Sequence, residues 1–140
     1  MSFRDIVNNV AYYSAFKDVI DSDTTTYTEY FDTAIFSHGI GFFANVLSYA
    51  DGTYTITLQH SEDHITWEDV PDDRQIFPDT NCVISADIPV KNYLPKVGAF
   101  STYRYVRAKI VSTGITTSGA VLDVIFAGVG YIKPVTKENY

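Results

Sequence analysis

Apolar and polar side chains alternate along several stretches of this 140-residue chain, and this period of two constrains the possible folds more than any other feature of the sequence. In residues 53–60 (TYTITLQH), Tyr54, Ile56 and Leu58 fall on one side of an extended chain, while threonines and a glutamine fall on the other. Successive side chains point to opposite faces of a β-strand, so the pattern predicts a strand with one buried face.

Residues 103–111 (YRYVRAKIV) show the same alternation. The apolar side chains that are expected to face the core are Val106, Ala108 and Ile110. The side chains that are expected to face outward form an aromatic and basic stripe: Tyr105, Arg107 and Lys109. Such a stripe is compatible both with a solvated strand face and with a surface that contacts another subunit.

Two further stretches, residues 39–50 and 120–132, are apolar on both faces over part of their length. This is typical of central strands, or of strands whose second face is covered. Turn-forming residues separate the strands at regular intervals, among them Asp51-Gly52 and the segment from Gly114 to Gly119. Short strands with such turns predict an all-β fold, an antiparallel β-sandwich or jelly roll, over residues 24–135.

The two ends of the chain have a different character. Apolar residues near the N-terminus recur at helical spacing: Phe3, Ile6, Val7 and Val10. Residues 3–16 could therefore form a short helix. Residues 1–23 are expected to be this short helix or an arm outside the sandwich core. An arm of this kind either covers the chain's own sheet or docks on a neighbouring subunit. Residues 136–140 are expected to be a polar tail, because Pro134 removes a hydrogen-bond donor and ends strand pairing.

The net charge of −7 argues against a nucleic-acid partner, because proteins that bind nucleic acids usually carry a basic face that neutralises phosphates. The charge is unevenly distributed. Residues 51–79 carry eight acidic side chains against one basic side chain, whereas residues 91–140 carry seven basic against two acidic. This asymmetry would allow copies of the chain to pair head to side, and two solvated faces are the alternative explanation.

Cys82 is the single cysteine, so a disulfide within the chain is impossible and synthesis in a reducing compartment is expected. It lies in an apolar alternating run, which favours a small buried thiol over a nucleophile. The N-terminal residues lack the apolar core of a cleavable signal peptide, and the longest apolar run, residues 124–130, is too short for a membrane span. We therefore expect a soluble protein made in the cytoplasm, with no membrane partner.

Residues 58–71 (LQHSEDHITWEDVP) bring two histidines, several carboxylates and the single tryptophan close together in the sequence. On one continuous strand, His60, Glu62 and His64 would share a face and offer three metal ligands. A hairpin that turns within this segment would instead send the two histidines to opposite arms or into the loop. Acid–base catalysis would need a carboxylate pair, such as Glu62 with Asp69, held across a cleft. The strand patterns on both sides favour the hairpin, so we expect neither a metal site nor a catalytic pair here.

The chain contains no nucleophile elbow, phosphate-binding loop or zinc-binding HExxH motif, and its residues indicate no cofactor. We therefore expect that the protein is not an enzyme and works through its surfaces.

Residues 51–71 and 101–135 resemble a recurrent pattern in virion structural proteins of tailed bacteriophages. In the first segment, Asp-Gly precedes an alternating strand, a polar turn, a strand with an aromatic residue, and Val-Pro. In the second, an Arg-Tyr-Val-Arg strand is followed by a Thr-Gly-rich turn, a long apolar strand and Pro-Val. The sequence differs from the pattern at His64, where the pattern favours glycine, and residues 1–35 are unmatched.

The resemblance implies a capsid decoration (cement) protein, a β-sandwich that lies on the outer capsid surface and binds major capsid protein subunits as a homotrimer. The side chains expected to contact the capsid or a neighbouring subunit lie in the N-terminal segment: Phe3, Ile6, Val10, Tyr12, Tyr13 and Phe16. The outward stripe of Tyr105, Arg107 and Lys109 is expected to contact an acidic patch of another subunit.

A carbohydrate-binding or adhesion module of a phage fibre or tail is the alternative function. In that case Trp67 and Tyr54 would stack on sugar rings, and the acidic residues 68–73 would hold hydroxyl groups or a calcium ion. A tail-tube or head–tail connector protein is a further structural possibility.

Overall fold

The structure is a computed structural model that describes residues 10–71, 82–87, 96–99 and 103–131. Nearly all of these residues lie in β-strands or in the turns that join them. The elements are β1 (Val10–Ile20), β2 (Thr24–Tyr27), β3 (Phe31–Asp32), the 3-10 turn η1 (Thr33–Ile35), β4 (Phe36–Tyr49), β5 (Thr53–Ser61), β6 (Glu68–Asp69), β7 (Cys82–Ile84), β8 (Lys96–Ala99), β9 (Tyr105–Thr113) and β10 (Ala120–Tyr131).

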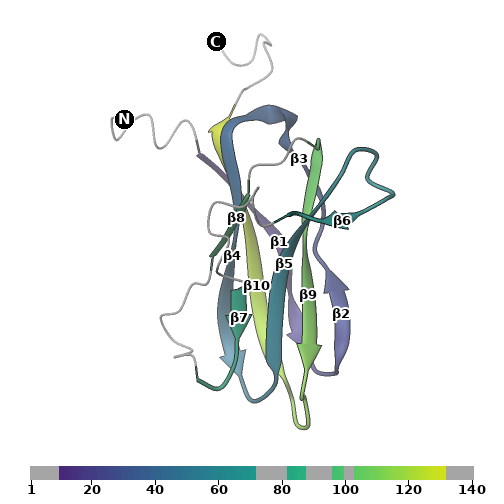
Figure 1. Cartoon of the computed structure of the whole chain (residues 1–140). Helices are drawn as coiled ribbons and strands as arrows, with labels where there is room; N and C mark the ends of the chain where they lie inside the picture. The colour runs from purple at the N-terminus through teal and green to yellow at the C-terminus, as the bar shows by residue number, and fades with distance from the viewer. Residues whose placement is uncertain (1–9, 72–81, 88–95, 100–102, 132–140) are drawn as a thin grey trace.

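The strands form two sheets that pack face to face (Figure 1). Sheet A has the order β1-β10-β4-β8, and sheet B has the order β2-β9-β5-β6, with β3 beside β9 and β7 beside β5. Each strand pairing within the described residues is antiparallel. The predicted all-β antiparallel sandwich is confirmed. Nowhere in the described part of the chain is there a helix with the length and apolar character of a membrane span.

Strand alternation builds the core as the sequence predicts. Tyr54, Ile56 and Leu58 of β5 are at most 1% exposed, and they face the core beside the buried side chains of β9. Those β9 side chains are the predicted ones: Val106, Ala108 and Ile110. Cys82 of β7 is also buried, and burial raises the pKa of its thiol to about 12. The prediction of a small buried thiol at this position is confirmed.

The strands β4 and β10 are central in sheet A, in agreement with their apolar sequences. Their side chains Phe42 and Phe126 meet Phe31, which comes from sheet B. The rings of Phe31 and Phe126 are stacked with centres 4.3 Å apart, and Phe42 approaches Phe126 edge-on at 5.3 Å. Burial of one such ring stabilises the fold by about 2–3 kcal/mol, so this group joins the two sheets.

The expectation for the N-terminal segment needs a correction. Residues 10–20 form the edge strand β1, paired with β10, so the expected helix is wrong for residues 10–16 and the sandwich begins at Val10 rather than at residue 24. The register shifts between Ser14 and Phe16, which makes Ala15 the extra residue of a β-bulge. The bulge places Tyr13 opposite Phe126 and Phe16 opposite Val124 of β10. Residues 1–9 and 136–140 lie outside the described residues.

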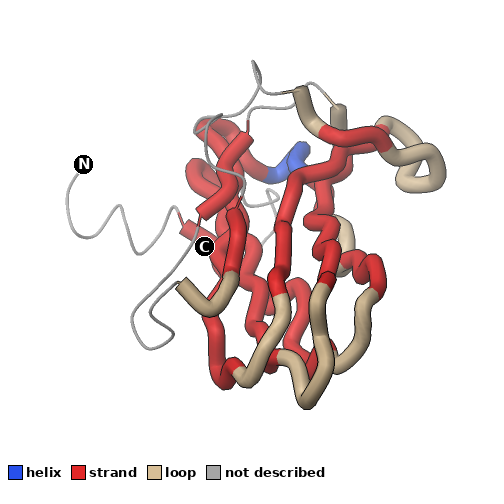
Figure 2. Tube along the Cα trace, turned by 60° about the horizontal axis from the view of Figure 1, so that its bottom comes forward, coloured by secondary structure: helices blue, strands red, loops and turns tan. Residues whose placement is uncertain are grey.

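The turns at the lower end of the sandwich lie side by side, as Figure 2 shows with that end brought forward. The carboxylate of Asp51, in the turn between β4 and β5, accepts hydrogen bonds from the backbone N–H groups of Thr116, Thr117 and Gly119 at 2.6, 2.8 and 2.9 Å. These bonds, that from Thr116 above all, hold the pKa of Asp51 well below its usual range. The turn between β4 and β5 is thereby fixed to the turn between β9 and β10.

Candidate interaction surface

The stretch from residue 58 to residue 71 is a hairpin, as predicted. Its arms are the end of β5 and the short strand β6, in which His60 pairs with Glu68 and Gln59 pairs with Asp69. The strand β6 has only two residues, so the loop between β5 and β6 covers residues 62–67. This loop is longer than the short turn that the sequence pattern suggests. This loop projects from the upper part of sheet B (Figure 1).

Asp63 organises the hairpin loop. Its Oδ1 accepts hydrogen bonds from the Ser61 hydroxyl at 2.8 Å and from the backbone N–H groups of Ile65 and Thr66 at 2.9 and 2.8 Å. These bonds, with that from Thr66 the strongest influence, lower the pKa of Asp63 to about 2. The loop therefore has a defined shape, and Ile65, 77% exposed, is held at its tip.

The two histidines of the hairpin lie in different environments. His60 is buried, with Nε2 3.1 Å from a carboxylate oxygen of Glu68 and its ring 4.2 Å from that of Tyr103. His64 is exposed, and its ring is stacked on Tyr30 with centres 5.1 Å apart. The structure thus does not bring the two histidines together around one metal. Within the described ranges, no group of three or more His, Cys, Asp or Glu side chains has the arrangement of a metal site.

The two carboxylates considered as an acid–base pair also have separate surroundings. Asp69 accepts hydrogen bonds from Gln59 and Lys109, whereas Glu62 lines an open hollow of about 170 Å³ beside the hairpin loop. The other residues that line this hollow are Asp63, Thr66, Glu68 and Tyr103.

Aromatic side chains from three segments gather on the outer face of sheet B. Tyr30 is the centre of the group: its ring contacts His64 at 5.1 Å, Trp67 at 6.0 Å and Tyr105 at 5.7 Å between ring centres. Tyr27 lies next to them across Arg107, and both Tyr27 and Tyr30 are 48% exposed. We call this surface the aromatic–arginine patch; it consists of Tyr27, Tyr30, His64, Trp67, Tyr105 and Arg107.

Arg107 lies between two rings of the patch. Its guanidinium carbon is 4.0 Å from the centre of the Tyr27 ring and 4.3 Å from that of Trp67, and its Nε donates a hydrogen bond of 3.0 Å to Gln59. Partial burial lowers the pKa of Arg107, although a guanidinium remains a cation at neutral pH. Two cation–π contacts and one hydrogen bond therefore fix its position.

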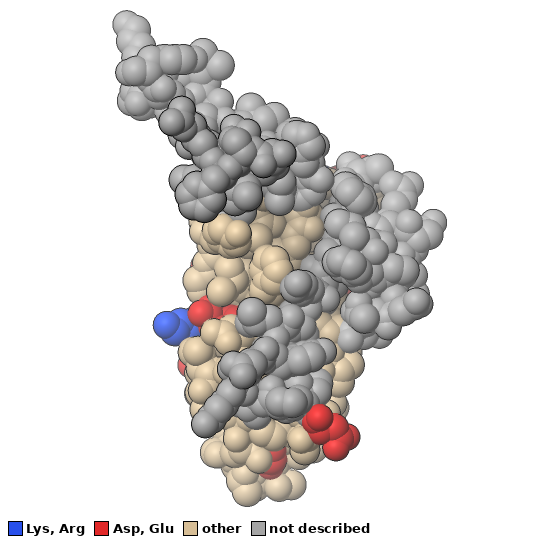
Figure 3. Space-filling view, turned by 90° about the vertical axis from the view of Figure 1, so that its left-hand side faces the viewer, with Lys and Arg blue, Asp and Glu red and all other residues tan. Residues whose placement is uncertain are grey.

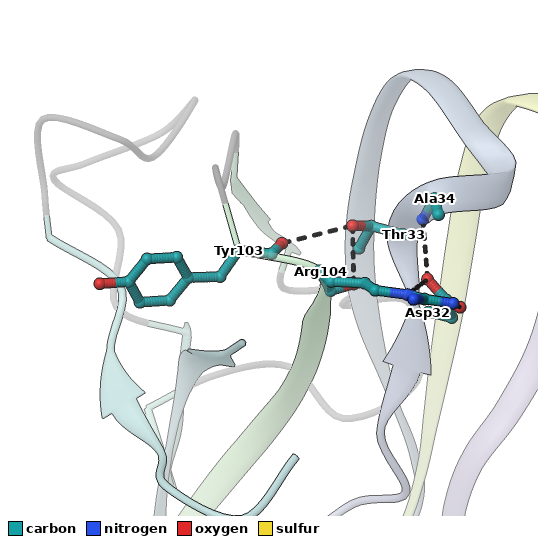
Figure 4. A network of polar contacts seen from close by, with 5 residues as sticks. All are labelled: Asp32, Thr33, Ala34, Tyr103 and Arg104. Carbon is teal, nitrogen blue, oxygen red and sulfur yellow. Dashed lines mark hydrogen bonds and ion pairs between the residues drawn. The ribbon is translucent and has the colours of Figure 1, made fainter. Parts of the chain in front are cut away.

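The neighbouring cations are already paired. Lys109 Nζ lies 3.1 Å from Asp69, and Gln59 donates a hydrogen bond to the same carboxylate. The hydrogen bond from Gln59, followed by the contact with Lys109, lowers the pKa of Asp69. Arg104 donates hydrogen bonds to both oxygens of Asp32, with the shortest distance 2.7 Å (Figure 4). In the described part of the chain no carboxylate pairs with Arg107 in the same way. Arg107 is thus the cation of the patch whose charge is left for a partner.

The Asp32–Arg104 pair belongs to a network that fixes the start of β9 (Figure 4). The N–H of Ala34 donates to Asp32 at 3.0 Å, and the hydroxyl of Thr33 donates to the carbonyl of Arg104 at 2.8 Å. The Arg104 hydrogen bonds are the main reason that the pKa of Asp32 is lowered. The network anchors η1 to β9 directly beside Tyr105, which stabilises this border of the patch.

No protein-family model matches this chain, and no curated protein matches it. Its fold is similar to a solved structure, that of the PBSX exported protein XepA. The TM-score is 0.55 at 11% sequence identity, over 91% of this chain and 39% of the XepA chain. The chain therefore spans well under half of the length of that protein, and the likeness concerns the fold alone.

The predicted subunit-contact residues lie together on the outer face of sheet B. Tyr105 and Arg107 are part of the patch, and Lys109 lies next to it on β9. Their contact with another subunit stays a prediction. Tyr27 and Tyr30 are not among the contact residues that the sequence predicts. The pairing of β2 with β9 brings Tyr27 opposite Lys109, and the sequence alone gives no sign of this register.

The predicted N-terminal contact residues have different positions. Phe3 and Ile6 lie outside the described residues, and Val10 begins β1. Tyr12 is 64% exposed, whereas Tyr13 packs near Phe31 and Phe126, and Phe16 packs against the core. Tyr12 is therefore available to a partner, while Phe16 contributes to the sandwich itself.

The arrangement proposed for sugar binding is wrong in one respect. Tyr54 is 0% exposed and cannot stack on a sugar, and Trp67 already has the Arg107 guanidinium over its ring. The two residues therefore do not form a common aromatic platform.

Proposed function

We propose that this chain is a non-enzymatic structural protein of a phage virion, which decorates and stabilises the capsid by binding major capsid protein subunits. The observation that carries the proposal is the aromatic–arginine patch, an exposed surface whose side chains are held in place before any partner binds. The sequence resemblance and the fold likeness to the phage PBSX exported protein XepA support a phage-related role.

The composition of the patch supports binding to a protein. Tyrosine, tryptophan and arginine dominate the binding energy of protein interfaces, because they bury a large area at a small cost in side-chain entropy. Arg107, Trp67 and Tyr30 are ordered by their mutual contacts, so little conformational freedom remains to be lost on binding. Ile65 at the hairpin tip adds an exposed apolar side chain at the border of the patch.

In this proposal the protein is made in the host cytoplasm and acts as a homotrimer on the outer surface of the capsid, without a cofactor, nucleic acid or membrane. The patch and Lys109 hold neighbouring subunits together, and Tyr12 with the N-terminal residues contacts the capsid. Each contact of such an oligomer is weak, but later contacts form at high effective concentration and strengthen the whole.

Co-sedimentation with purified phage heads that lack this protein tests the proposal. The wild-type chain is expected to bind the heads. The double substitution Trp67→Ala and Arg107→Ala is expected to weaken binding at least about tenfold, because it removes two interface residues and the avidity that depends on them.

The control for this experiment is Lys17→Ala, which removes an exposed cation from sheet A. This variant should bind as the wild type does, and circular dichroism should show that all three proteins are folded. A wild-type chain that does not bind heads would refute the decoration role. Unchanged binding by the double variant would show that the patch does not contribute to head binding.

A further inference from the structure

We infer that copies of this chain associate end to side, with the acidic lower end of one copy against the aromatic–arginine patch of the next. The inference rests on the proposed homotrimer. A ring with three-fold symmetry needs a heterologous interface, in which each copy contributes two different surfaces. The patch is one such surface, and the structure offers a second with complementary charge.

The second surface consists of the turns at the lower end of the sandwich. The aspartates there, Asp21, Asp23, Asp51 and Asp87, come from three separate turns, and none of the described residues in these turns is Lys or Arg. In the view of Figure 3 the described acidic side chains at this end have no Lys or Arg among them. We call this surface the acidic end.

The acidic end has a fixed shape. Asp51 binds the turn before β10, and Asp23 accepts a hydrogen bond from the N–H of Ile115 at 2.9 Å, so the first, second and last turns are joined. An open hollow of about 400 Å³ lies between the turn that joins β4 to β5, the turn after β7 and the end of β9, and Asp51 and Asp87 border it. Asp21 and Asp87 are exposed, and no cation pairs with them in the described part of the chain. Their charges are therefore available to a partner.

Charge complementarity selects the occupant of the patch. Arg104 and Lys109 are paired with carboxylates, so Arg107 is the cation on the outer face of sheet B that has no carboxylate partner among the described residues. A second copy can compensate it with the unpaired aspartates of its acidic end. A guanidinium held between two rings is partly desolvated, and a carboxylate that approaches it gains more than it would from a freely hydrated cation.

The two surfaces lie in different parts of the molecule, so the contact pairs unlike surfaces and need not form twice across one two-fold axis. The patch lies on the outer face of sheet B near the β5–β6 loop, while the acidic end lies at the opposite end of the strands (Figure 1). A contact between them is repeated from copy to copy, and it closes into a ring when the rotation per copy allows.

Sedimentation velocity at low ionic strength tests the inference. The wild-type chain is expected to form a closed oligomer. Arg107→Glu and, separately, the pair Asp21→Arg with Asp87→Arg are each expected to reduce the mass about threefold, to that of the monomer. The control Lys17→Glu makes the same charge change as Arg107→Glu on sheet A, and Asp123→Arg reverses one acidic charge on that sheet; both should leave the oligomer intact.

Mixing two neutralised variants, Arg107→Ala and the pair Asp21→Ala with Asp87→Ala, gives a sharper result, because charge-reversed variants would attract each other through both surfaces. The Arg107→Ala chain retains its acidic end and the Asp21→Ala, Asp87→Ala chain retains its patch, so one productive contact remains possible. The mixture should form a one-to-one complex and nothing larger. A monomeric wild type, an oligomer that survives either charge reversal, or a mixture that forms larger assemblies would overturn the end-to-side contact. If a monomeric wild type bound phage heads, the decoration role would still hold. If the wild type formed the oligomer but did not bind phage heads, the decoration role would be refuted and the end-to-side contact would not.

Discussion

At the scale of single residues, His64 combines an unfavourable backbone with a favourable side-chain contact. Its φ of 52° lies in the left-handed region, which other residues of the described chain occupy only as glycine. The parallel stack of its ring on Tyr30 compensates for part of this cost. The phage pattern favours glycine at this position, and glycine adopts such a φ without strain. Histidine lacks this backbone freedom but adds an aromatic contact within the patch.

The hairpin loop depends on one carboxylate, and its stability should depend on pH. The pKa of Asp63 is lowered from 3.8 to about 2, so its hydrogen bonds stabilise the fold above pH 4 and are lost as the pH falls toward 2. Asp63→Ala is therefore expected to lower the Tm at pH 7, and the difference in Tm from the wild type should shrink steadily below pH 4.

Thermal unfolding followed by circular dichroism between pH 7 and pH 3 measures this effect. Glu62→Ala is the control, because Glu62 lies next to Asp63 but makes none of these hydrogen bonds. A difference in Tm that stays constant down to pH 3 would show that the Asp63 carboxylate does not organise the loop.

At the scale of elements, the long strands could be predicted because a buried face requires a period of two. The predicted inward and outward residues of β5 and β9 are those of the structure. The strand β1 could not be predicted, because the bulge at Ala15 changes the phase of its alternation. Strands as short as β3 and β6 leave no periodic signal, since pairing with distant residues determines them.

Gly119 shows how closely the elements approach one another at the lower end. A methyl group at this position would lie 1.9 Å from the Ile20 carbonyl oxygen, and φ is +68°. Gly119→Ala is expected to cost about 3 kcal/mol or more in the free energy of unfolding, because the backbone conformation and the contact are both unfavourable.

Gly114→Ala is the matched control for this substitution. Gly114 has a similar φ of +71°, but a methyl group there would meet no atom within 4 Å, so a cost of about 1 kcal/mol is expected. Urea unfolding of the two variants measures the difference. Equal losses would mean that the turn before β10 does not pack against the end of β1 in this way.

At the scale of the whole molecule, the sandwich brings together residues that are far apart in the sequence. Tyr27, Trp67 and Arg107 lie on separate elements, and they meet because β9 pairs with β2 on one side and with β5 on the other. The outward stripe of β9 could be predicted from its alternation, but its aromatic neighbours could not, because strand order is not encoded in local periodicity. The hairpin likewise could be predicted, whereas the stack of His64 on Tyr30 depends on the fold.

The proposed function assigns this molecule to the outer surface of a phage head, and electron cryomicroscopy of intact virions tests that assignment most directly. In this proposal the virions are those of a phage that encodes the chain. The expected result is density for the sandwich on the outside of the head, in groups of three around a three-fold position, with the outer face of sheet B turned toward the neighbouring copy. Density confined to the tail or its fibres, or virions without the chain, would contradict it.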